Sequence, residues 1–416
     1  MNPGVAGAGV PSSKSQDPII NTKIAEFTRL RKIIASGNKS IEYRLRWVKM
    51  LMTATNFKLY AYINIKGEPI PPEQAAFNKT LFVKSSVTHL VKLLREFEAG
   101  KDRHLDVKHE VYFIYACLLK SDYHTSYNQD FGIPKNIPGA VEYFEKCLEL
   151  HPTDFKTMYK LGDIYEYELD QFDRALEYYK QSAKGYNRAI YKISLLYLNV
   201  PEIRNIKFLR YLEDLSNIDP LDIRLDPEDK EDLEEVIGLA CYQLGRVYEG
   251  IYPGDLTSND EFVQRALELA PVNYAKSLTY YNKSAKLNCL LAQVKLGLIY
   301  EFGELNRPQN ANKSIQWYLR AASSPLPFKR HPDAMLGLSR WNVIGSQGVS
   351  KHVPMPNPDK AVMWCDRAFK EFGSADAAFY MGELTEMGVC PGDPTPWYTR
   401  AYEMGHPEAS AKLGFA

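Results

Sequence analysis

The side chains that come nearest to a catalytic or metal-binding arrangement lie close to residue 105. His104 and His109 flank Asp106, and Glu110 follows directly. A zinc protease places two histidines four residues apart on one helix face, so that both imidazoles reach one ion. That spacing is absent here and no third ligand lies nearby. We therefore interpret these residues as the surface of a loop that enters a helix.

No other stretch carries a recognisable chemistry. Asp255, Asp260 and Glu261 share a loop without the spacing of a calcium loop. Serine does not occur in a Gly-x-Ser-x-Gly setting. The glycine-rich segment 4–9 precedes no strand, so a nucleotide-binding loop is not indicated. We predict no catalytic residue, no bound metal and no cofactor, and we expect a protein that is not an enzyme.

Charge and cysteine usage narrow the choice of partners and compartment. The chain has 51 Lys and Arg against 51 Asp and Glu, so its net charge is zero. This balance predicts no nucleic-acid partner. No window reaches the roughly 18 apolar residues of a membrane span, so direct membrane insertion is not expected. The six cysteines contain no C-x-x-C pair, which is typical of buried free thiols in a reducing compartment.

The strongest pattern is an internal repeat, seen most clearly over residues 290–322. Ala292, Leu296, Gly297 and Tyr300 share one side of a helix, a break follows, and a second helical pattern ends in a pair of alanines. Aligned on the Leu-Gly pair, seven starts recur, spaced roughly 32 to 52 residues as in helical-hairpin arrays: Leu161-Gly162, Ile193-Ser194, Leu244-Gly245, Leu296-Gly297, Leu338-Ser339, Met381-Gly382 and Leu413-Gly414.

The residue types of the repeat have a simple physical reason. A small residue beside leucine lets the paired helix approach closely, and the aromatic one turn away fills the groove that remains. A single hairpin cannot bury its apolar face, so the units must stack. The order Ala, Leu-Gly, Tyr, Gly, Ala, Trp-Tyr and Ala-Ala resembles the Sel-one-like branch of the tetratricopeptide superfamily. This resemblance implies an all-α solenoid, a right-handed superhelix that serves as an adaptor.

We expect three regions along the chain. Residues 1–20 form a disordered tail, residues 21–106 form an atypical helical cap of cryptic hairpins, and residues 107–416 form the solenoid. Whether 21–106 caps the array or is a separate binding module stays open. Helices are expected over 24–34, 40–63 and 73–97. The approximate solenoid units are 107–152, 154–186, 187–220, 231–288, 289–324, 332–373, 375–405 and a partial unit 406–416.

Basic residues on the second expected helix allow two interpretations. Arg44, Arg46, Lys49 and Lys58 form either a phosphate-binding face or the solvated flank of a packed helix. The second interpretation is favoured.

The resemblance also places a binding surface on the first helix of each unit. In tetratricopeptide units, residues three before, one after and four after the glycine point to the concave face. Those positions predict a protein-binding set of Tyr159, Asp163, Glu166, Tyr242, Arg246, Glu249, Val294, Leu298, Glu301, Arg340, Phe379, Glu383 and Glu386. The recurring glutamate at the last position is either an acidic stripe for a basic partner or part of the repeat's own turn chemistry, and the second is favoured.

The leader narrows the resemblance further. The segment 42–50, followed by 62–67, resembles fungal chitin synthase regulatory factors and a related activator of protein kinase C signalling. This implies an activator of chitin synthase or of cell-wall-integrity signalling, with a chitin synthase subunit or a signalling kinase component as partner. It also implies a cytoplasmic protein that a partner recruits to the cell cortex. The C-terminus lacks the prenylation box of the chitin synthase activator. The alternative is a substrate adaptor of a ubiquitin ligase in protein quality control.

Overall fold

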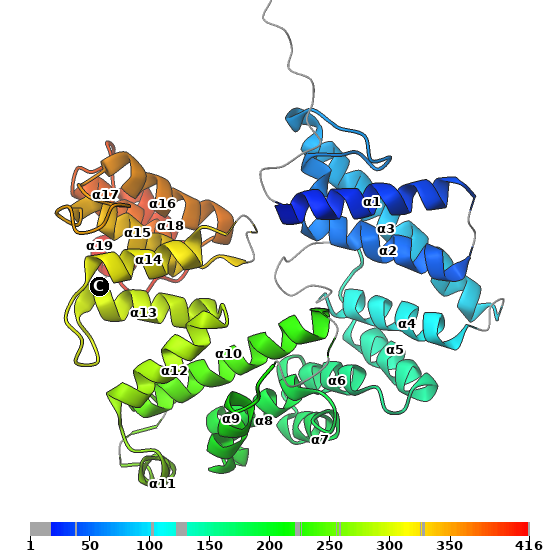
Figure 1. Ribbon diagram of the computed structural model, residues 1–416, viewed down its shortest axis with the longest axis horizontal. Coiled ribbons are helices and arrows are strands. Elements are labelled where there is room, and N and C mark those ends of the chain that lie inside the picture. Colours follow the sequence, from blue (N-terminus) through cyan, green and yellow to red (C-terminus); the bar gives the residue numbers. More distant parts are fainter. Residues whose placement is uncertain are drawn as a thin grey trace, which may run out of the picture. The chain divides into compact units, whose positions relative to one another are not determined.

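The computed structural model contains α-helices joined by turns and by longer loops, such as the one between Ile344 and Pro358 (Figure 1). In the described residues, the only pairing of the β type is an isolated bridge between Ile63 and Pro69. The chain divides into two compact units, Met1–Lys184 and Gly185–Ala416. The structure describes residues 18–37, 40–100, 104–121, 131–220, 225, 227–254, 256–257, 259–324, 326 and 329–414.

The first unit combines a three-helix cap with two hairpins. In the cap, α2 pairs with α3 and α1 packs on α2, whereas α4–α5 and α6–α7 form the hairpins. The helices are α1 (Pro18–Ala35), α2 (Ile41–Asn56), α3 (Ala75–Glu98), α4 (Leu105–Lys120), α5 (Ile137–Leu150), α6 (Phe155–Tyr167) and α7 (Phe172–Ser182). The helix α1 begins at Pro18, inside the segment expected to be a tail, and residues 1–17 of that segment lie outside the described residues.

Aromatic packing holds the cap together. The Phe27 ring centroid lies 5.1 Å from that of Trp47 and 5.4 Å from that of Phe82, so one ring joins all three helices. The helix expected over 40–63 ends earlier, at Asn56, because Lys58 takes a left-handed conformation with φ of 53°. Two short 3-10 turns, Leu59–Ala61 and Pro72–Gln74, then lead to α3.

The cap shares its core with the first hairpin. One cluster of buried side chains runs from α2 and α3 into α4 and α5, and it includes Val48, Leu90, Leu94, Val111 and Cys147. Because these side chains exclude water together, α2 and α3 are stabilised by the hairpin that follows them. The helices α2 and α3 and the first hairpin thus share one hydrophobic core.

The second unit is a run of five hairpins. The pairs are α8–α9, α10–α12, α13–α14, α15–α16 and α17–α18, and from α12 onward each second helix also contacts the next first helix. The helices are α8 (Asn187–Asn199), α9 (Lys207–Ser216), α10 (Pro227–Glu249), α11 (Glu261–Leu269), α12 (Tyr274–Lys286), α13 (Leu290–Phe302), α14 (Ala311–Ala322), α15 (Pro332–Ile344), α16 (Pro358–Phe372), α17 (Ala375–Glu386), α18 (Thr395–Glu403) and α19 (Ala409–Lys412). The predicted α-solenoid of stacked hairpins is confirmed.

An asparagine fixes where several second helices begin. The side-chain oxygen of this asparagine accepts a hydrogen bond from the backbone N–H three residues later. The backbone N–H of the same asparagine donates to a backbone carbonyl near the end of the first helix of the hairpin. Asn310, for example, accepts from Lys313 at 2.9 Å and donates to Tyr300 at 2.8 Å. Such a cap satisfies an otherwise unpaired donor of the helix N-terminus. The same arrangement recurs at Asn136, Asn273 and Asn357.

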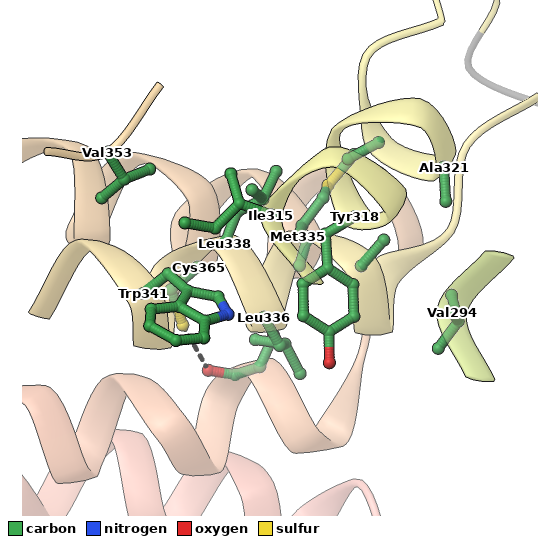
Figure 2. Packing of buried hydrophobic residues seen from close by; sticks show 14 of the residues in the cluster. Val294, Ile315, Tyr318, Ala321, Met335, Leu336, Leu338, Trp341, Val353 and Cys365 are labelled. Atoms are coloured by element: carbon green, nitrogen blue, oxygen red, sulfur yellow. Dashed lines mark hydrogen bonds between the residues drawn. The ribbon is translucent and has the colours of Figure 1, made fainter. Parts of the chain in front are cut away.

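The core of the second unit lies between consecutive hairpins. Figure 2 shows Tyr318 of α14 beside Met335 and Leu338 of α15, with Trp341 one turn further along. The indole N–H of Trp341 donates to the Ser314 hydroxyl at 2.9 Å, which satisfies a buried polar group across the boundary between the two hairpins. These contacts place the first helices side by side, since α13 touches α15 and α15 touches α17.

Candidate partner-binding surface

In four hairpins the glycine of the Leu-Gly pair lies against a tyrosine ring of the second helix. An added Cβ would approach the ring to 2.8 Å at Gly162, 2.5 Å at Gly245, 2.3 Å at Gly297 and 2.6 Å at Gly382. Only a residue without a Cβ lets the ring rest directly on the helix backbone. The rings belong to Tyr179, Tyr281, Tyr318 and Tyr398.

The hydroxyl of each of these tyrosines reaches the glutamate one turn after the glycine. Each donates to a carboxylate oxygen at 2.5 to 2.6 Å, short enough to be a charge-assisted hydrogen bond. A buried hydroxyl needs an acceptor, and position four after the glycine puts a carboxylate on the required side of the first helix. The pairs are Tyr179–Glu166, Tyr281–Glu249, Tyr318–Glu301 and Tyr398–Glu386.

In the second unit a basic side chain from the next repeat completes the contact. Lys295 Nζ lies 2.8 Å from Glu249, and Lys412 Nζ lies 2.6 Å from Glu386. Arg340 donates through two nitrogens to the two oxygens of Glu301, both at 2.8 Å. The repeated glutamates therefore join neighbouring repeats, which is a structural role independent of any partner. In the first unit, Lys120 of α4 also forms an ion pair, with Asp163 of α6.

The protonation of this contact follows from its surroundings. Burial raises the pKa of Tyr179, Tyr281 and Tyr318, and it raises the pKa of Tyr398 to about 12. The hydrogen bond from Lys412 lowers the pKa of Glu386, as does the one from Tyr398. At neutral pH each tyrosine is thus a neutral donor.

The predicted residues three before the glycine mostly face the interior. Tyr159, Tyr242 and Phe379 lie against the repeat tyrosine of their own hairpin, with ring centroids 5.4 to 5.7 Å apart. Val294 is buried in the core of the second unit. A partner therefore reaches little of this position.

The residues directly after the glycine are more varied. Asp163 and Arg340 belong to the ion pairs above, and Leu298 is half-buried against the core. Arg246 and Glu383 are also half-buried, and neither forms an ion pair with another residue that the structure describes. Partial burial raises the pKa of Glu383. Of the thirteen predicted residues, Glu386 is the exposed one, with a side chain that is 51% exposed, whereas Arg246, Leu298 and Glu383 are half-buried.

Sequence reasoning missed the position five residues after the small residue of the Leu-Gly, Leu-Ser or Met-Gly pair, which in α13 and α17 directly follows the repeated glutamate. This position holds Phe302 in α13, Ile344 in α15 and Met387 after α17, which are 55%, 62% and 55% exposed. We call these three residues the apolar row. Arg340 lies between Phe302 and Ile344. Its guanidinium is 5.9 Å from the Phe302 ring centroid, and Arg340 itself is one helical turn before Ile344 in α15. The sequence alone could have revealed this position, because Phe302, Ile344 and Met387 each lie five residues after the small residue of their repeat. In the first unit Tyr167 occupies the same position and is 61% exposed.

The acidic and histidine residues near position 105 do not converge on one point. His109 lies 2.8 Å from Asp154, whereas Asp106 pairs with His151 at 3.3 Å. Within the described ranges no group of three or more His, Cys, Asp or Glu side chains could hold a metal ion. On α2, Arg44 and Lys49 form ion pairs with Glu96 and Glu110, whereas Lys58 lies beyond the end of that helix.

Comparison with known protein families identifies the repeat. The model described as the Sel1 repeat matches residues 122–150, 156–187, 238–289, 290–325 and 332–371. This chain carries Sel1 repeats. The hairpin α17–α18 lies beyond the last match, yet it has the same glycine, tyrosine and glutamate contacts as its neighbours. No helix in the described part of the chain has the length and apolar character needed to cross a bilayer.

The Sel1-repeat chain is similar to fungal regulatory proteins, as the resemblance of its leader predicted. It is 30% identical over 399 residues to chitin synthase regulatory factor 3 of Schizosaccharomyces pombe, covering 92% of this chain and 38% of that protein. It is 27% identical over 416 residues to activator of C kinase protein 1 of Saccharomyces cerevisiae, covering 93% of this chain and 61% of that protein. The chain thus spans less than two thirds of these relatives.

Among solved structures, a Sel1 repeat protein from Oxalobacter formigenes is 19% identical, with a TM-score of 0.44. The match covers 64% of this chain and 94% of that one.

Proposed function

We propose that this chain is a non-enzymatic adaptor that binds a partner protein along the first helices of its Sel1 repeats. The similarity to chitin synthase regulatory factors and to an activator of C kinase supports a regulatory role in chitin synthesis or in cell-wall-integrity signalling. The partner is accordingly a chitin synthase subunit or a signalling kinase component. We place the protein in the cytoplasm, from which this partner recruits it to the cell cortex.

The observation that carries this proposal is the apolar row. Phe302, Ile344 and Met387 are large, more than half exposed, and repeat at one position in three consecutive hairpins. Soluble proteins keep contiguous exposed apolar surface small unless it binds something. Aromatic residues and methionine are enriched in protein interfaces, and a few such anchors supply most of the binding energy.

Polar residues of the first helices complete the proposed interface. Arg246 and Glu383 each lie three residues before the end of their helix, and neither forms an ion pair among the described residues. Half-exposed charges suit the rim of an interface, where they steer a partner into register. The repeated glutamates contribute indirectly, by holding consecutive first helices in place.

The decisive experiment compares two triple variants of the full chain. F302A/I344A/M387A removes the apolar row, and L269A/V349A/M363A removes three exposed apolar residues outside the first helices. Each protein is added to fungal membranes that contain chitin synthase, and both co-sedimentation and chitin synthase activity are measured. We expect the first variant to lose at least tenfold in binding and to lose any activation, while the control retains both. Equal behaviour of the two variants, with native circular dichroism, would refute the proposed surface.

A further inference from the structure

The net charge of the whole chain is zero, but the N-terminal cap is strongly basic. Between residues 18 and 98 there are 14 Lys and Arg against 6 Asp and Glu, a net charge of +8. The rest of the chain carries the compensating negative charge. Such an asymmetry creates a local positive field around one region of a protein that is neutral overall.

Part of this charge lies along one exposed side of α3, next to two apolar residues. Six residues spaced three or four apart form this line, which we call the α3 stripe: Phe77, Leu81, Lys84, Thr88, Lys92 and Arg95. That spacing places them on one face of the helix over about 27 Å. Phe77 is 70% exposed and Leu81 is 36% exposed, so the stripe has an apolar end and a basic end.

The positive charge of the stripe is not neutralised within the described part of the chain. Lys84, Lys92 and Arg95 form no ion pair there. The two acidic residues of α3 are engaged elsewhere. Glu96 accepts two hydrogen bonds from Arg44 of α2, at 2.6 and 2.8 Å, and Glu98 accepts one from the Tyr143 hydroxyl of α5. Lys84, Lys92 and Arg95 are therefore available to the carboxylates of a ligand, because the neighbouring Glu96 is already paired with Arg44.

A groove runs beside the basic end of the stripe. It has a volume of about 590 Å³, with the half-buried Val87 and Val91 on its apolar side. The described residues that line it are Val87, Thr88, Val91, Lys92, Arg95 and Glu96. A groove of this kind takes the side chains of a narrow protein segment, whereas a bilayer presents a broad surface that does not enter it.

We propose that the α3 stripe binds an acidic amphipathic segment of another protein. Apolar side chains of that segment cover Phe77 and Leu81, and its carboxylates pair with Lys84, Lys92 and Arg95. The apolar anchors supply affinity, and the charges supply orientation and a fast, salt-dependent association. This surface lies outside the Sel1 repeats and does not depend on the function proposed for the apolar row.

The test uses the full chain and a fluorescent synthetic peptide of about 20 residues. One half of the peptide carries leucine and phenylalanine at helical spacing, and the other half carries glutamates at the same spacing. A second peptide has glutamine in place of every glutamate. The variant K84E/K92E/R95E is compared with R265E/R307E/K351E, which removes the same charge from exposed cations of the other unit. Vesicles containing phosphatidylserine serve as the membrane probe.

We expect the acidic peptide to bind the native chain and the control variant alike, and to bind K84E/K92E/R95E at least tenfold more weakly. Phe77→Ala should also weaken binding, and the glutamine peptide should bind poorly even to the native chain. Equal loss in both charge variants would reduce the effect to net charge and overturn the proposal. Binding of the vesicles in place of the peptide would overturn it in favour of a membrane surface.

Discussion

Tyr318 of α14 rests its ring on Gly297 of α13, where an added Cβ would lie 2.3 Å from the ring. The other edge of the same ring lies against Gly337 of α15, at a corresponding distance of 2.4 Å. One side chain thus joins three helices from two repeats. The two glycines leave space for the Tyr318 ring. The contact with Gly297 closes the hairpin α13–α14, and the contact with Gly337 packs this hairpin against the next one.

This contact predicts that Gly297→Val destabilises the array. The new side chain would overlap the Tyr318 ring, and overpacking a core of this kind costs about 1–3 kcal/mol. Urea unfolding followed by circular dichroism measures the loss. Gly254→Val is the matched control, since nothing lies within 4 Å of a Cβ at that loop position. Equal unfolding midpoints for the two variants would show that the helices separate without penalty.

The hydrogen bond between Tyr281 and Glu249 predicts a measurable coupling. Tyr281 is fully buried and its hydroxyl lies 2.6 Å from the carboxylate. We expect Tyr281→Phe to lower the free energy of unfolding by about 1.5–3 kcal/mol, the range for hydrogen bonds to charged groups. In a double-mutant cycle with Glu249→Ala, which removes the acceptor, the loss in the double variant should be smaller than the sum of the two single losses. Tyr274→Phe, at an exposed tyrosine without a hydrogen bond among the described residues, should change little. Strict additivity in the cycle would contradict the contact.

The hairpins could be predicted from the sequence, but the contacts and the exposure of their side chains could not. Small residues at Gly245, Gly297 and Gly382 recur in phase because helices must touch there, so the fold follows from spacing alone. The spacing also places Glu301 on the correct side of its helix. It does not reveal that Tyr318 and Arg340 both bond to this glutamate, since that depends on the rotation of two other helices. The exposure of Phe302 depends on the same packing.

The cap was the least predictable region. The apolar pattern over 40–63 continues past Asn56, but the left-handed turn at Lys58 depends on tertiary contacts. The buried Asn78 amide donates to the carbonyl of Tyr60 at 2.8 Å and to that of Ile63, and so holds the chain in a turn. A helical continuation would leave Asn78 without these acceptors. The buried hydrogen bonds of Asn78 therefore stabilise a turn at residues 57–63, although the local apolar pattern favours a helix there.

The ion pair between Arg340 and Glu301 predicts a penalty for removing the arginine alone. The Glu301 side chain is only 9% exposed, so Arg340→Met would leave a buried carboxylate with Tyr318 as its remaining partner. We expect a loss of about 1–3 kcal/mol, because an uncompensated buried charge is costly and Arg340 is itself partly exposed. Lys370→Met, which removes a surface pair with Asp366, should cost less than about 1 kcal/mol. Similar losses for both variants would place Glu301 in solvent.

The tyrosines of the repeat predict a loss of stability at alkaline pH. Burial raises the pKa of Tyr398 in the folded chain to about 12, against an ordinary value near 10. The neutral phenol is therefore favoured by the folded state, and its contribution is complete below pH 10. Above pH 10 the unfolded chain loses the phenolic proton while the folded chain retains it, so the stability contributed by Tyr398 falls as the pH rises toward 12.

Tyr398→Phe isolates this contribution from the other tyrosines. The variant should be less stable than the native chain at pH 8, because it lacks the hydrogen bond to Glu386. The difference in melting temperature between the two proteins should then shrink between about pH 10 and pH 12, since phenylalanine does not titrate. Melting curves that stay parallel over that range would mean that Tyr398 ionises equally in the folded and unfolded chains. The ring would then be open to water, and the closed contact with Gly382 and Glu386 would not exist in solution.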